Sequence, residues 1–260
     1  MKSVKRNAAL IRDQIAVLVQ KEFKLKYNAT ALGFAWCLLV PLLMSMVYYV
    51  VFGLLMKVGR APNYLLYLVC GNFLWQFFAS VVSMNGNVLA KNSSLLKKTN
   101  FDERLLVWGT FFAEGLHFLL VIPVLALIMI CYGVMPQWWS ILPNLLAAMT
   151  ALTLLAVGVS YLYAALNLIF RDLERLMRII LQVWFYASPV FIPITIIPGR
   201  YLKFYYLNPM AAIMTIWRGI FYTPRMEWKL YLPAIFISCA VFLAGRVVFR
   251  KLQPVFAEKM

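Results

Sequence analysis

The sequence predicts an all-α polytopic membrane protein with six transmembrane helices, an amphipathic N-terminal interface helix and a re-entrant helical pair before the last span. Apolar residues make up 64% of the 260 positions and charged residues only 13%, whereas soluble domains are nearer half apolar and a quarter charged. Uncharged stretches cover residues 27–56, 61–90, 115–170 and 179–199. A span needs about 20 apolar residues, and unbroken runs of this kind favour helices over the alternating strands of a barrel.

Six segments are long and apolar enough to be predicted as spans. Gly133 and Pro136 break the chain between the third and the fourth. The expected spans are residues 34–56, 64–84, 106–132, 141–169, 179–197 and 230–250. Residues 1–260 therefore form a single transmembrane domain, in which residues 34–250 hold the spans and residues 251–260 form a tail.

The first 33 residues predict a helix that lies along the membrane surface. Apolar residues recur at helical spacing from Ile11 to Phe23, and cationic side chains such as Arg12 and Lys21 lie between them. A plain cytoplasmic helix is the alternative. The formal charge of +16 suits anionic lipid head groups. Nucleic acid is not an expected partner, because no basic patch with interleaved aromatic residues lies in a soluble domain.

The distribution of Lys and Arg predicts the orientation. With the N-terminus in the cytoplasm, 18 of the 25 cationic residues fall on the cytoplasmic side and 7 on the other. Since cytoplasmic loops are enriched in Lys and Arg, both termini are expected inside. The exception is the outside segment 198–229, which alone carries five of the seven.

The segment 188–222 does not have the pattern of a further span. Pro189, Pro193 and Pro198 interrupt its first half, and residues 204–217 give only 14 uncharged positions. Fourteen helical residues extend about 21 Å, short of a hydrocarbon core of about 30 Å. Two short helices that enter the outer leaflet and return fit this pattern. An ordinary apolar extracellular loop is the alternative.

The loop around "KNSSLLKKTNFDERLL" is a candidate for contact with a soluble partner. It is polar, it carries both charge signs, and Leu95, Leu96 and Phe101 are expected to be exposed. A solvated loop rich in positive charge explains the same residues. The local chemistry leaves both interpretations open.

The sequence gives no sign of a catalytic or metal centre. Glu114 and His117 share a face of the third expected span, where polar packing and a proton relay are both open. One histidine with one carboxylate nearby makes no metal site. No phosphate-binding loop and no nucleophile motif is present, so we expect no catalytic residue and no cofactor bound by this chain. Small residues at Ala147, Ala151 and Gly158 predict close helix packing.

Five segments resemble the type 2 ABC exporter permeases, in the order in which that family has them. "LGFAWCLLVPLL" resembles its L-G-x-x-W-x-x-L-x-P-L entry pattern at Leu32, Gly33, Trp36, Leu39, Pro41 and Leu42. "GNFLWQFF" resembles G-x-x-x-W-x-x-F at Gly71, Trp75 and Phe78. "KKTNFDERLL" resembles the K-K-x-x-F-P coupling segment, with Asp102 in the place of the usual proline. The last two resemble N-x-x-x-R-D with S-P-V, and N-P-M with a following arginine, at Asn167, Arg171, Asp172, Ser188, Pro189, Val190, Asn208, Pro209, Met210 and Arg218.

The resemblance extends over nearly the whole chain and is strongest to the polysaccharide and O-antigen export subgroup. It implies a homodimer in a bacterial inner membrane, two soluble ABC ATPase subunits that hold ATP and magnesium, and a lipid-linked glycan as substrate. Teichoic acid, lipid or drug export by the same architecture stays open, as do an integral membrane transferase and a passive assembly subunit.

The resemblance also assigns expected roles to residues. Contact with the ATPase is expected at Leu95, Lys97, Lys98, Asn100, Phe101, Asp102 and Glu103. An outer gate is expected at Ser188, Pro189, Pro193, Pro198, Asn208 and Pro209, and the cytoplasmic end of the fourth span at Arg171 and Asp172. Because aromatic faces stack on sugar rings, Tyr48, Phe52, Phe185 and Tyr186 are expected along the substrate pathway.

The orientation predicts which positions an impermeant thiol reagent reaches. A cysteine introduced by Arg200→Cys should be labelled in intact cells, and one introduced by Lys98→Cys only after permeabilisation. Mass-tag labelling before and after permeabilisation measures both. The reverse pattern would overturn the orientation.

Overall fold

The computed structural model describes residues 2–27, 35–57, 63–98, 101–170, 172–193, 198–222 and 228–259. Every regular element in these ranges is a helix, which confirms the all-α prediction. In chain order the helices are α1 (Lys2–Tyr27), α2 (Trp36–Tyr48), the π-helical η2 (Tyr49–Leu55), α3 (Tyr64–Gly86), α4 (Val88–Lys91), α5 (Ser93–Lys98), α6 (Arg104–Leu119), α7 (Ile122–Cys131), α8 (Trp138–Ile169), α9 (Leu173–Tyr186), α10 (Gly199–Tyr206), α11 (Pro209–Tyr222) and α12 (Trp228–Lys259).

Five helical segments among the described residues are long and apolar enough to cross a membrane. They are Leu38–Leu55, Tyr64–Gly86, Arg104–Cys131, Trp138–Ile169 and Trp228–Phe256. They correspond to the first four expected spans and to the last. The third is interrupted between α6 and α7, where Pro123 stands in the first turn of α7. Proline lacks the amide hydrogen that would continue the helix, so it suits a first turn and marks a break before it.

The fifth expected span, residues 179–197, has different limits in the structure. Helix α9 begins earlier, at Leu173, and ends at Tyr186; turns follow through Val190, and residues 194–197 lie outside the described ranges. Proline disfavours helical backbone at the residue before it, so Ser188–Pro189 ends the helix. Fourteen residues give α9 a length of about 21 Å, and the expectation of one continuous helix to residue 197 is wrong.

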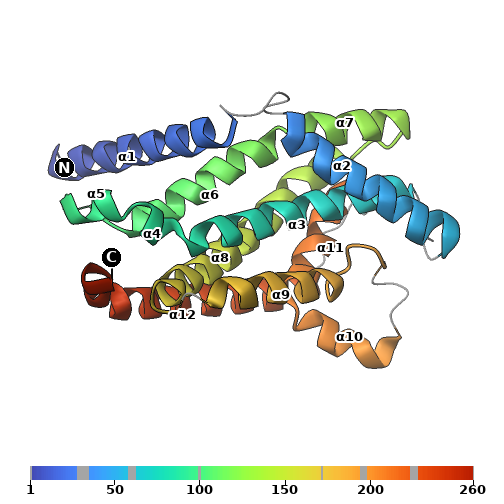
Figure 1. Ribbon diagram of the computed structural model, residues 1–260. Helices are drawn as coiled ribbons and strands as arrows, with labels where there is room; N and C mark the ends of the chain where they lie inside the picture. Colours follow the sequence, from blue (N-terminus) through green and yellow to red (C-terminus); the bar gives the residue numbers. More distant parts are fainter. Residues whose placement is uncertain are drawn as a thin grey trace.

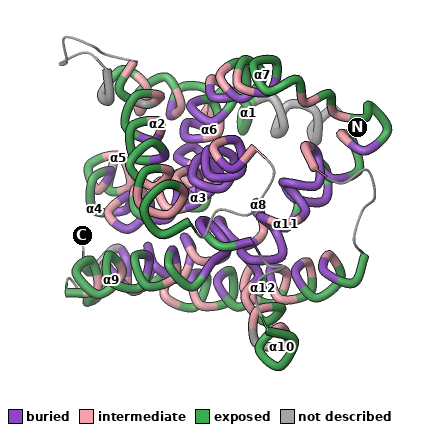
Figure 2. The backbone as a smooth tube through the Cα atoms, turned by 90° about the vertical axis from the view of Figure 1, so that its right-hand side faces the viewer, coloured by how far each residue is buried: buried purple, intermediate pink, exposed green. Residues whose placement is uncertain are grey.

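Helices α3, α8 and α11 lie in the middle of the bundle, and the other helices surround them (Figure 1, Figure 2). Nearly every residue of α3 from Tyr64 to Phe78 is buried, and α11 is buried from Pro209 to Ile220. Helix α2 and the outer faces of α7 and α12 instead expose large apolar side chains. A short helix placed inside the bundle must satisfy its ends and the adjoining loops with protein groups.

Helices α8 and α12 approach each other closely enough for their backbones to touch. A Cβ atom on Gly158 would lie 2.6 Å from the Cα atom of Phe242, and a Cβ on Gly245 would collide with the Gly158 carbonyl. Ala147 and Ala151, on the same helix as Gly158, are buried. The predicted small-residue contact is thus present at Gly158, where the two backbones touch.

A second, smaller core joins the helices at the end of the bundle where the N- and C-terminal ends of the chain lie (Figure 1). Side chains from α1, α4, α6, α8 and α12 meet there. They include Leu18, Leu89, Leu106, Tyr161, Phe249 and Phe256. Helix α1 packs along α6, with Leu18 against Gly109, while Leu10 and Val17 on α1 stay exposed. This core fixes the loop that holds α4 and α5.

Candidate functional site

Arg218 of α11 is a buried cation whose hydrogen-bond partners, within the described residues, are neutral backbone carbonyls. Its side chain is 5% exposed. The guanidinium donates hydrogen bonds to the carbonyl oxygens of Tyr67, at 3.2 and 3.0 Å, of Val190, at 3.1 Å, and of Pro189. Its central carbon also lies 3.4 Å from the centroid of the Tyr67 ring. A buried charge without hydrogen bonds is very unfavourable, and the planar fork of arginine can serve several acceptors at once.

Gly71 provides the space for this guanidinium. A Cβ atom at Gly71 would lie 3.0 Å from Cζ of Arg218 and would collide with its Nη2. Glycine is therefore required one turn after Tyr67. The glycine of the "GNFLW" pattern and the arginine of α11 are two halves of one contact. We call Tyr67, Gly71, Pro189, Val190 and Arg218 the arginine junction.

Asn208 joins the end of α9 to the start of α11. Its Nδ2 donates to the carbonyl of Ala187 at 3.1 Å and to Oγ of Ser188 at 3.2 Å. Its Oδ1 accepts from Nε1 of Trp184 at 2.8 Å and from the amide of Met210 at 3.1 Å. The last bond caps the first turn of α11. The "SPV" and "NPM" segments, 20 residues apart, are thus held together directly.

The expected gate residues are mostly inside the protein. Ser188, Pro189, Pro193 and Pro209 are buried, Asn208 is half-buried, and Pro198 is exposed. The hydroxyl of Tyr64 donates to the carbonyl of Phe191 at 2.9 Å, and that of Tyr67 to the carbonyl of Pro189 at 3.1 Å. The turn after α9 is therefore held against α3 by side-chain donors and is not an exposed loop.

The four aromatic residues expected along a pathway lie together around Phe191. Ring centroids of Tyr48, Phe52, Phe185 and Tyr186 lie 4.7, 4.6, 5.1 and 5.9 Å from that of Phe191. Such distances fit edge-to-face and offset contacts. Tyr186 is 60% exposed, so the cluster reaches the surface of this chain. Phe191 was not among the predicted residues, although it follows directly after the "SPV" segment.

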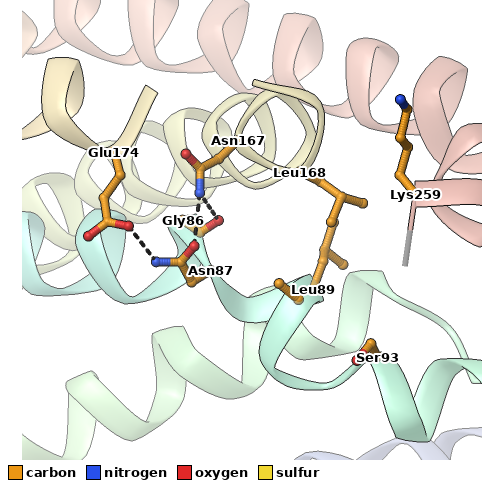
Figure 3. A pocket seen from close by; sticks show the side chains of 9 residues that line it. Gly86, Asn87, Leu89, Ser93, Asn167, Leu168, Glu174 and Lys259 are labelled. Carbon is orange, nitrogen blue, oxygen red and sulfur yellow. Dashed lines mark hydrogen bonds between the residues drawn. The ribbon is translucent and has the colours of Figure 1, made fainter. Parts of the chain in front are cut away.

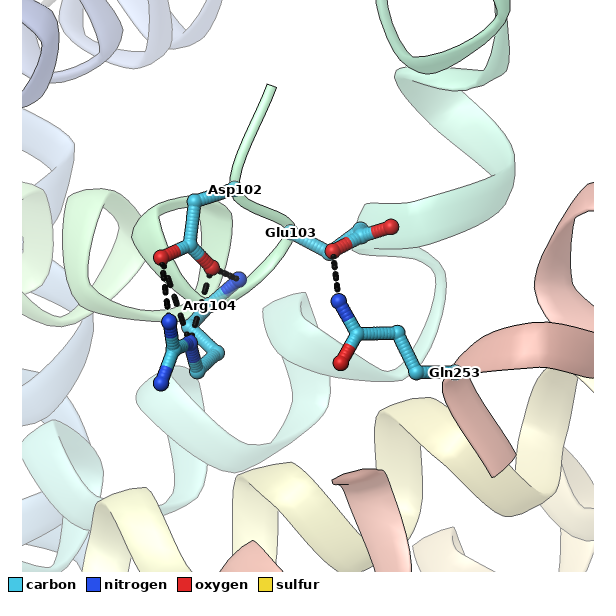
Figure 4. A network of polar contacts seen from close by, with 4 residues as sticks. All are labelled: Asp102, Glu103, Arg104 and Gln253. Carbon is cyan, nitrogen blue, oxygen red and sulfur yellow. Dashed lines mark hydrogen bonds and ion pairs between the residues drawn. The ribbon is translucent and has the colours of Figure 1, made fainter. Parts of the chain in front are cut away.

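The expected partner-contacting loop is attached to the second core. Leu95, Leu96 and Phe101 are half-buried and pack on that core, so the expectation that these side chains are exposed is wrong. Oε2 of Glu103 accepts from Nε2 of Gln253 in α12 at 2.6 Å (Figure 4). Lys97 is exposed. Asn100 and the side chain of Lys98 lie outside the described part of the chain.

Asp102 forms the turn that enters α6. Its Oδ1 accepts from the backbone amide of Arg104 at 3.0 Å, and its carboxylate pairs with the Arg104 guanidinium at 2.7 Å (Figure 4). Burial acts to raise the pKa of Asp102, but the hydrogen bonds and charge of Arg104 outweigh it and hold that pKa below its ordinary value. Aspartate that bonds the amide two residues on makes its own turn, which explains how the chain turns without the usual proline.

A polar pocket lies beside this loop, between the ends of α3, α8 and α12 and the starts of α4 and α9 (Figure 3). Nδ2 of Asn167 donates to the Gly86 carbonyl and to Oδ1 of Asn87, both at 3.0 Å, and Nδ2 of Asn87 donates to Oε2 of Glu174 at 3.0 Å. The cavity holds about 280 Å³. Asp172, just before α9, is exposed, and Arg171 lies outside the described residues.

Glu114 and His117 link α6 to α1. Both are buried, with Nδ1 of His117 3.5 Å from Oε2 of Glu114. The imidazole stacks on Phe23 of α1 at a centroid distance of 5.1 Å. Within the described ranges, no group of three or more His, Cys, Asp or Glu residues is placed to hold a metal ion.

Comparison with known proteins gives a family match over most of the chain. The model of the family "ABC-2 type transporter" matches residues 13–222. An O-antigen export system permease protein RfbA of Klebsiella pneumoniae is 33% identical over 258 residues, which cover 98% of both chains. One of Myxococcus xanthus is 29% identical over 96% of both chains. The polysialic acid transport protein KpsM of Escherichia coli is 20% identical over 78% of this chain and 79% of its own.

The arginine junction predicts a non-additive pair of substitutions. Gly71→Ala should destabilise the purified protein because the new methyl group collides with the guanidinium. Arg218→Ala should also destabilise it, by about 2–4 kcal/mol, because hydrogen bonds to a charged group are lost. The double variant should be less destabilised than the sum, since the methyl group then enters space the guanidinium has left. Thermal denaturation in detergent measures each.

Gly115→Ala is the matched control for this cycle, because a Cβ atom there meets nothing within 4 Å. It should leave the midpoint unchanged or raise it slightly, since alanine in a helix interior is more stable than glycine by about 0.5–1 kcal/mol. Strict additivity of the two junction substitutions would show that Gly71 and Arg218 do not share one contact.

Proposed function

The chain belongs to the ABC-2 type transporter family, and we propose that it is the transmembrane subunit of an ATP-driven exporter of a lipid-linked polysaccharide. The observation that carries the proposal is the likeness to O-antigen export permeases, which extends over 98% of both chains. The several apolar helices suit a multi-pass protein of the bacterial inner membrane.

In this proposal, a partner subunit binds and hydrolyses the ATP that drives export. The sequence contains no phosphate-binding loop, so in this proposal ATP and magnesium bind to two copies of a soluble ABC ATPase, and two copies of this chain form the channel. The loop from Leu95 to Glu103 is the proposed contact with the ATPase. Its attachment to α12 through Glu103 and Gln253 supports this role, because a force on the loop reaches the long helix directly.

The proposed topology has six crossings and a re-entrant pair. Helix α9 with the turn after it makes the fifth crossing, and α10 and α11 enter the outer leaflet and return. Irregular backbone at membrane depth persists only where protein groups satisfy it or water reaches it. Arg218, Tyr64 and Tyr67 donate hydrogen bonds to the backbone carbonyls of residues 189–191. These carbonyls therefore have protein partners without water.

The aromatic cluster is the proposed surface along which the glycan moves. A sugar ring has apolar faces and hydroxyl edges, so ring faces with phenol groups suit it on both counts. Tyr48 and Tyr186 contribute hydroxyl groups, and Phe52, Phe185 and Phe191 contribute the apolar faces of their aromatic rings. A glycan polymer that moves through the protein needs many weak contacts. Stacking of sugar rings on aromatic side chains provides such contacts without forming a high-affinity binding site.

Other substrates of the same architecture are the second candidate. Teichoic acid, lipid or drug export would use the same helices and the same partner. The likeness to a polysialic acid transport protein favours a glycan. A membrane transferase is less well supported, because the described residues bring no group of three or more His, Cys, Asp or Glu side chains together.

Glycan-dependent ATP hydrolysis tests the proposal. The chain should co-purify with an ABC ATPase encoded beside it, and the reconstituted complex should hydrolyse ATP faster when the lipid-linked glycan of the host is added. An ATPase variant without its phosphate-binding lysine is the control. A complex that forms but responds to lipids or drugs and not to the glycan would instead support the second candidate.

The pathway role of the aromatic cluster predicts an export defect without a folding defect. Tyr48→Ala combined with Tyr186→Ala should lower surface polysaccharide several-fold at equal protein level, because two stacking platforms are removed. Immunoblotting of membranes and surface polysaccharide staining measure the two quantities.

The matched control is Phe112→Ala combined with Phe236→Ala, which removes two exposed rings outside the cluster. Normal export by the tyrosine variant, or an equal loss in the control, would contradict the assignment of the pathway to this cluster.

A further inference from the structure

A cluster of cationic and polar side chains joins the first turns of α6 to α8 and α12. Tyr161 of α8 lies at its centre, and the Trp108 side chain of α6 is a hydrogen-bond partner of the Tyr161 hydroxyl. Arg104 of α6 and Arg246 of α12 lie near enough to act on the same hydroxyl electrostatically. We call Arg104, Trp108, Tyr161 and Arg246 the cationic cluster. It brings two guanidinium groups and a phenol from three helices to one place.

Arg246 lies inside the apolar span of α12 and not beyond its end. The span Trp228–Phe256 contains it. Seven residues, about 10 Å of helix, separate it from Gln253, which contacts Glu103 directly before α6. Arg246 is exposed, and so are its apolar neighbours Leu243 and Val247. An exposed cation among exposed apolar side chains requires an anion or water at its head group.

The protein neutralises only part of the charge of the cationic cluster. Asp102 pairs with Nε and Nη2 of Arg104, and a guanidinium has further donors on its other nitrogen. Glu103, the next carboxylate along the chain, accepts from Gln253. Among the residues that the structure describes, none forms an ion pair with Arg246. Two cations and one carboxylate thus act on the Tyr161 hydroxyl, which leaves a positive charge there.

Exposed apolar side chains continue from the cluster along both helices. On α6, Leu116 and Leu119 are 43% and 55% exposed, and helical spacing puts them within a face of about 100° that includes Trp108. On α12, Leu243 and Val247 are 54% and 51% exposed. A ligand that matches this surface has an anionic head and long apolar chains. Anionic phospholipids have both, and basic and aromatic side chains at a membrane surface attract their head groups.

We propose that the cationic cluster binds the phosphate group of an anionic phospholipid from the surrounding membrane. The planar guanidinium of Arg246 pairs with two phosphate oxygens, and the Tyr161 hydroxyl, which accepts from Trp108, donates to a third. The acyl chains lie along the exposed apolar side chains of α6 and α12. The bound lipid then bridges these two helices. This role does not depend on which substrate the protein exports.

Thermal denaturation of the full-length subunit in detergent tests the proposal. The midpoint should rise as dioleoylphosphatidylglycerol is titrated, since a ligand of the folded state stabilises it, and should not rise with phosphatidylcholine or inorganic phosphate. Arg246→Gln should require about tenfold more phosphatidylglycerol for the same rise, the effect of losing a hydrogen bond to a charged group. Arg246→Lys keeps the charge without the planar fork and should be intermediate. Tyr161→Phe should weaken the response without any change of charge.

Arg175→Gln is the matched control, because it removes the same charge from an exposed position on α9 and should respond to phosphatidylglycerol within twofold of the unchanged subunit. No rise with phosphatidylglycerol, or the same response in Arg246→Gln and Tyr161→Phe as in the unchanged subunit, overturns the proposal. An equal loss in Arg175→Gln overturns it in favour of general surface charge. A rise with inorganic phosphate alone, or a changed oligomeric state of Arg246→Gln in size-exclusion chromatography, also overturns it, in favour of a free-phosphate site or a contact between copies of the chain.

Discussion

The arrangement around α11 depends on one buried guanidinium that has no carboxylate partner in the described chain. Arg218 must be surrounded by acceptors, and regular helices offer few, since their carbonyls already accept from their own amides. The turn after α9 supplies Pro189 and Val190, and α3 supplies Tyr67. Gly71 is then fixed by the space the guanidinium fills. A proline-broken segment, a glycine in α3 and an arginine in α11 are consequences of the same requirement.

The junction also sets where the aromatic cluster lies. Phe191 follows the two carbonyls that Arg218 binds, and Tyr64 of α3 binds the carbonyl of Phe191 itself at 2.9 Å. The ring of Phe191 is thereby held between η2 and the end of α9, where it meets Phe52 and Phe185. The polar contacts fix the backbone, and the rings then fill the space between α2, η2 and α9.

The sequence was sufficient for the helical class and for five of the spans, because hydropathy is a local property that length and composition reveal. It was insufficient for contacts between distant residues. Arg218 is one of the five cations of the outside segment 198–229, yet it is buried, so the loop charge on that side is smaller than the sequence count indicates. Phe191 was missed and the exposure of the half-buried Leu95 was wrongly predicted for the same reason, since their neighbours come from other helices.

The neutral acceptors of the junction constrain how this part of the protein can move. Separating an ion pair inside a membrane protein would cost Coulomb energy over a long range, and no ion pair to Arg218 is formed by the residues that the structure describes. Leaving the guanidinium without acceptors would still be very unfavourable. Movement of α11 away from α3 therefore requires the turn at Pro189 and Val190 to travel with Arg218, or other acceptors to replace it. Because Asn208 ties the same turn to Trp184, the end of α9 and the start of α11 are joined on both sides, and a shift of α9 along its axis displaces them as one body.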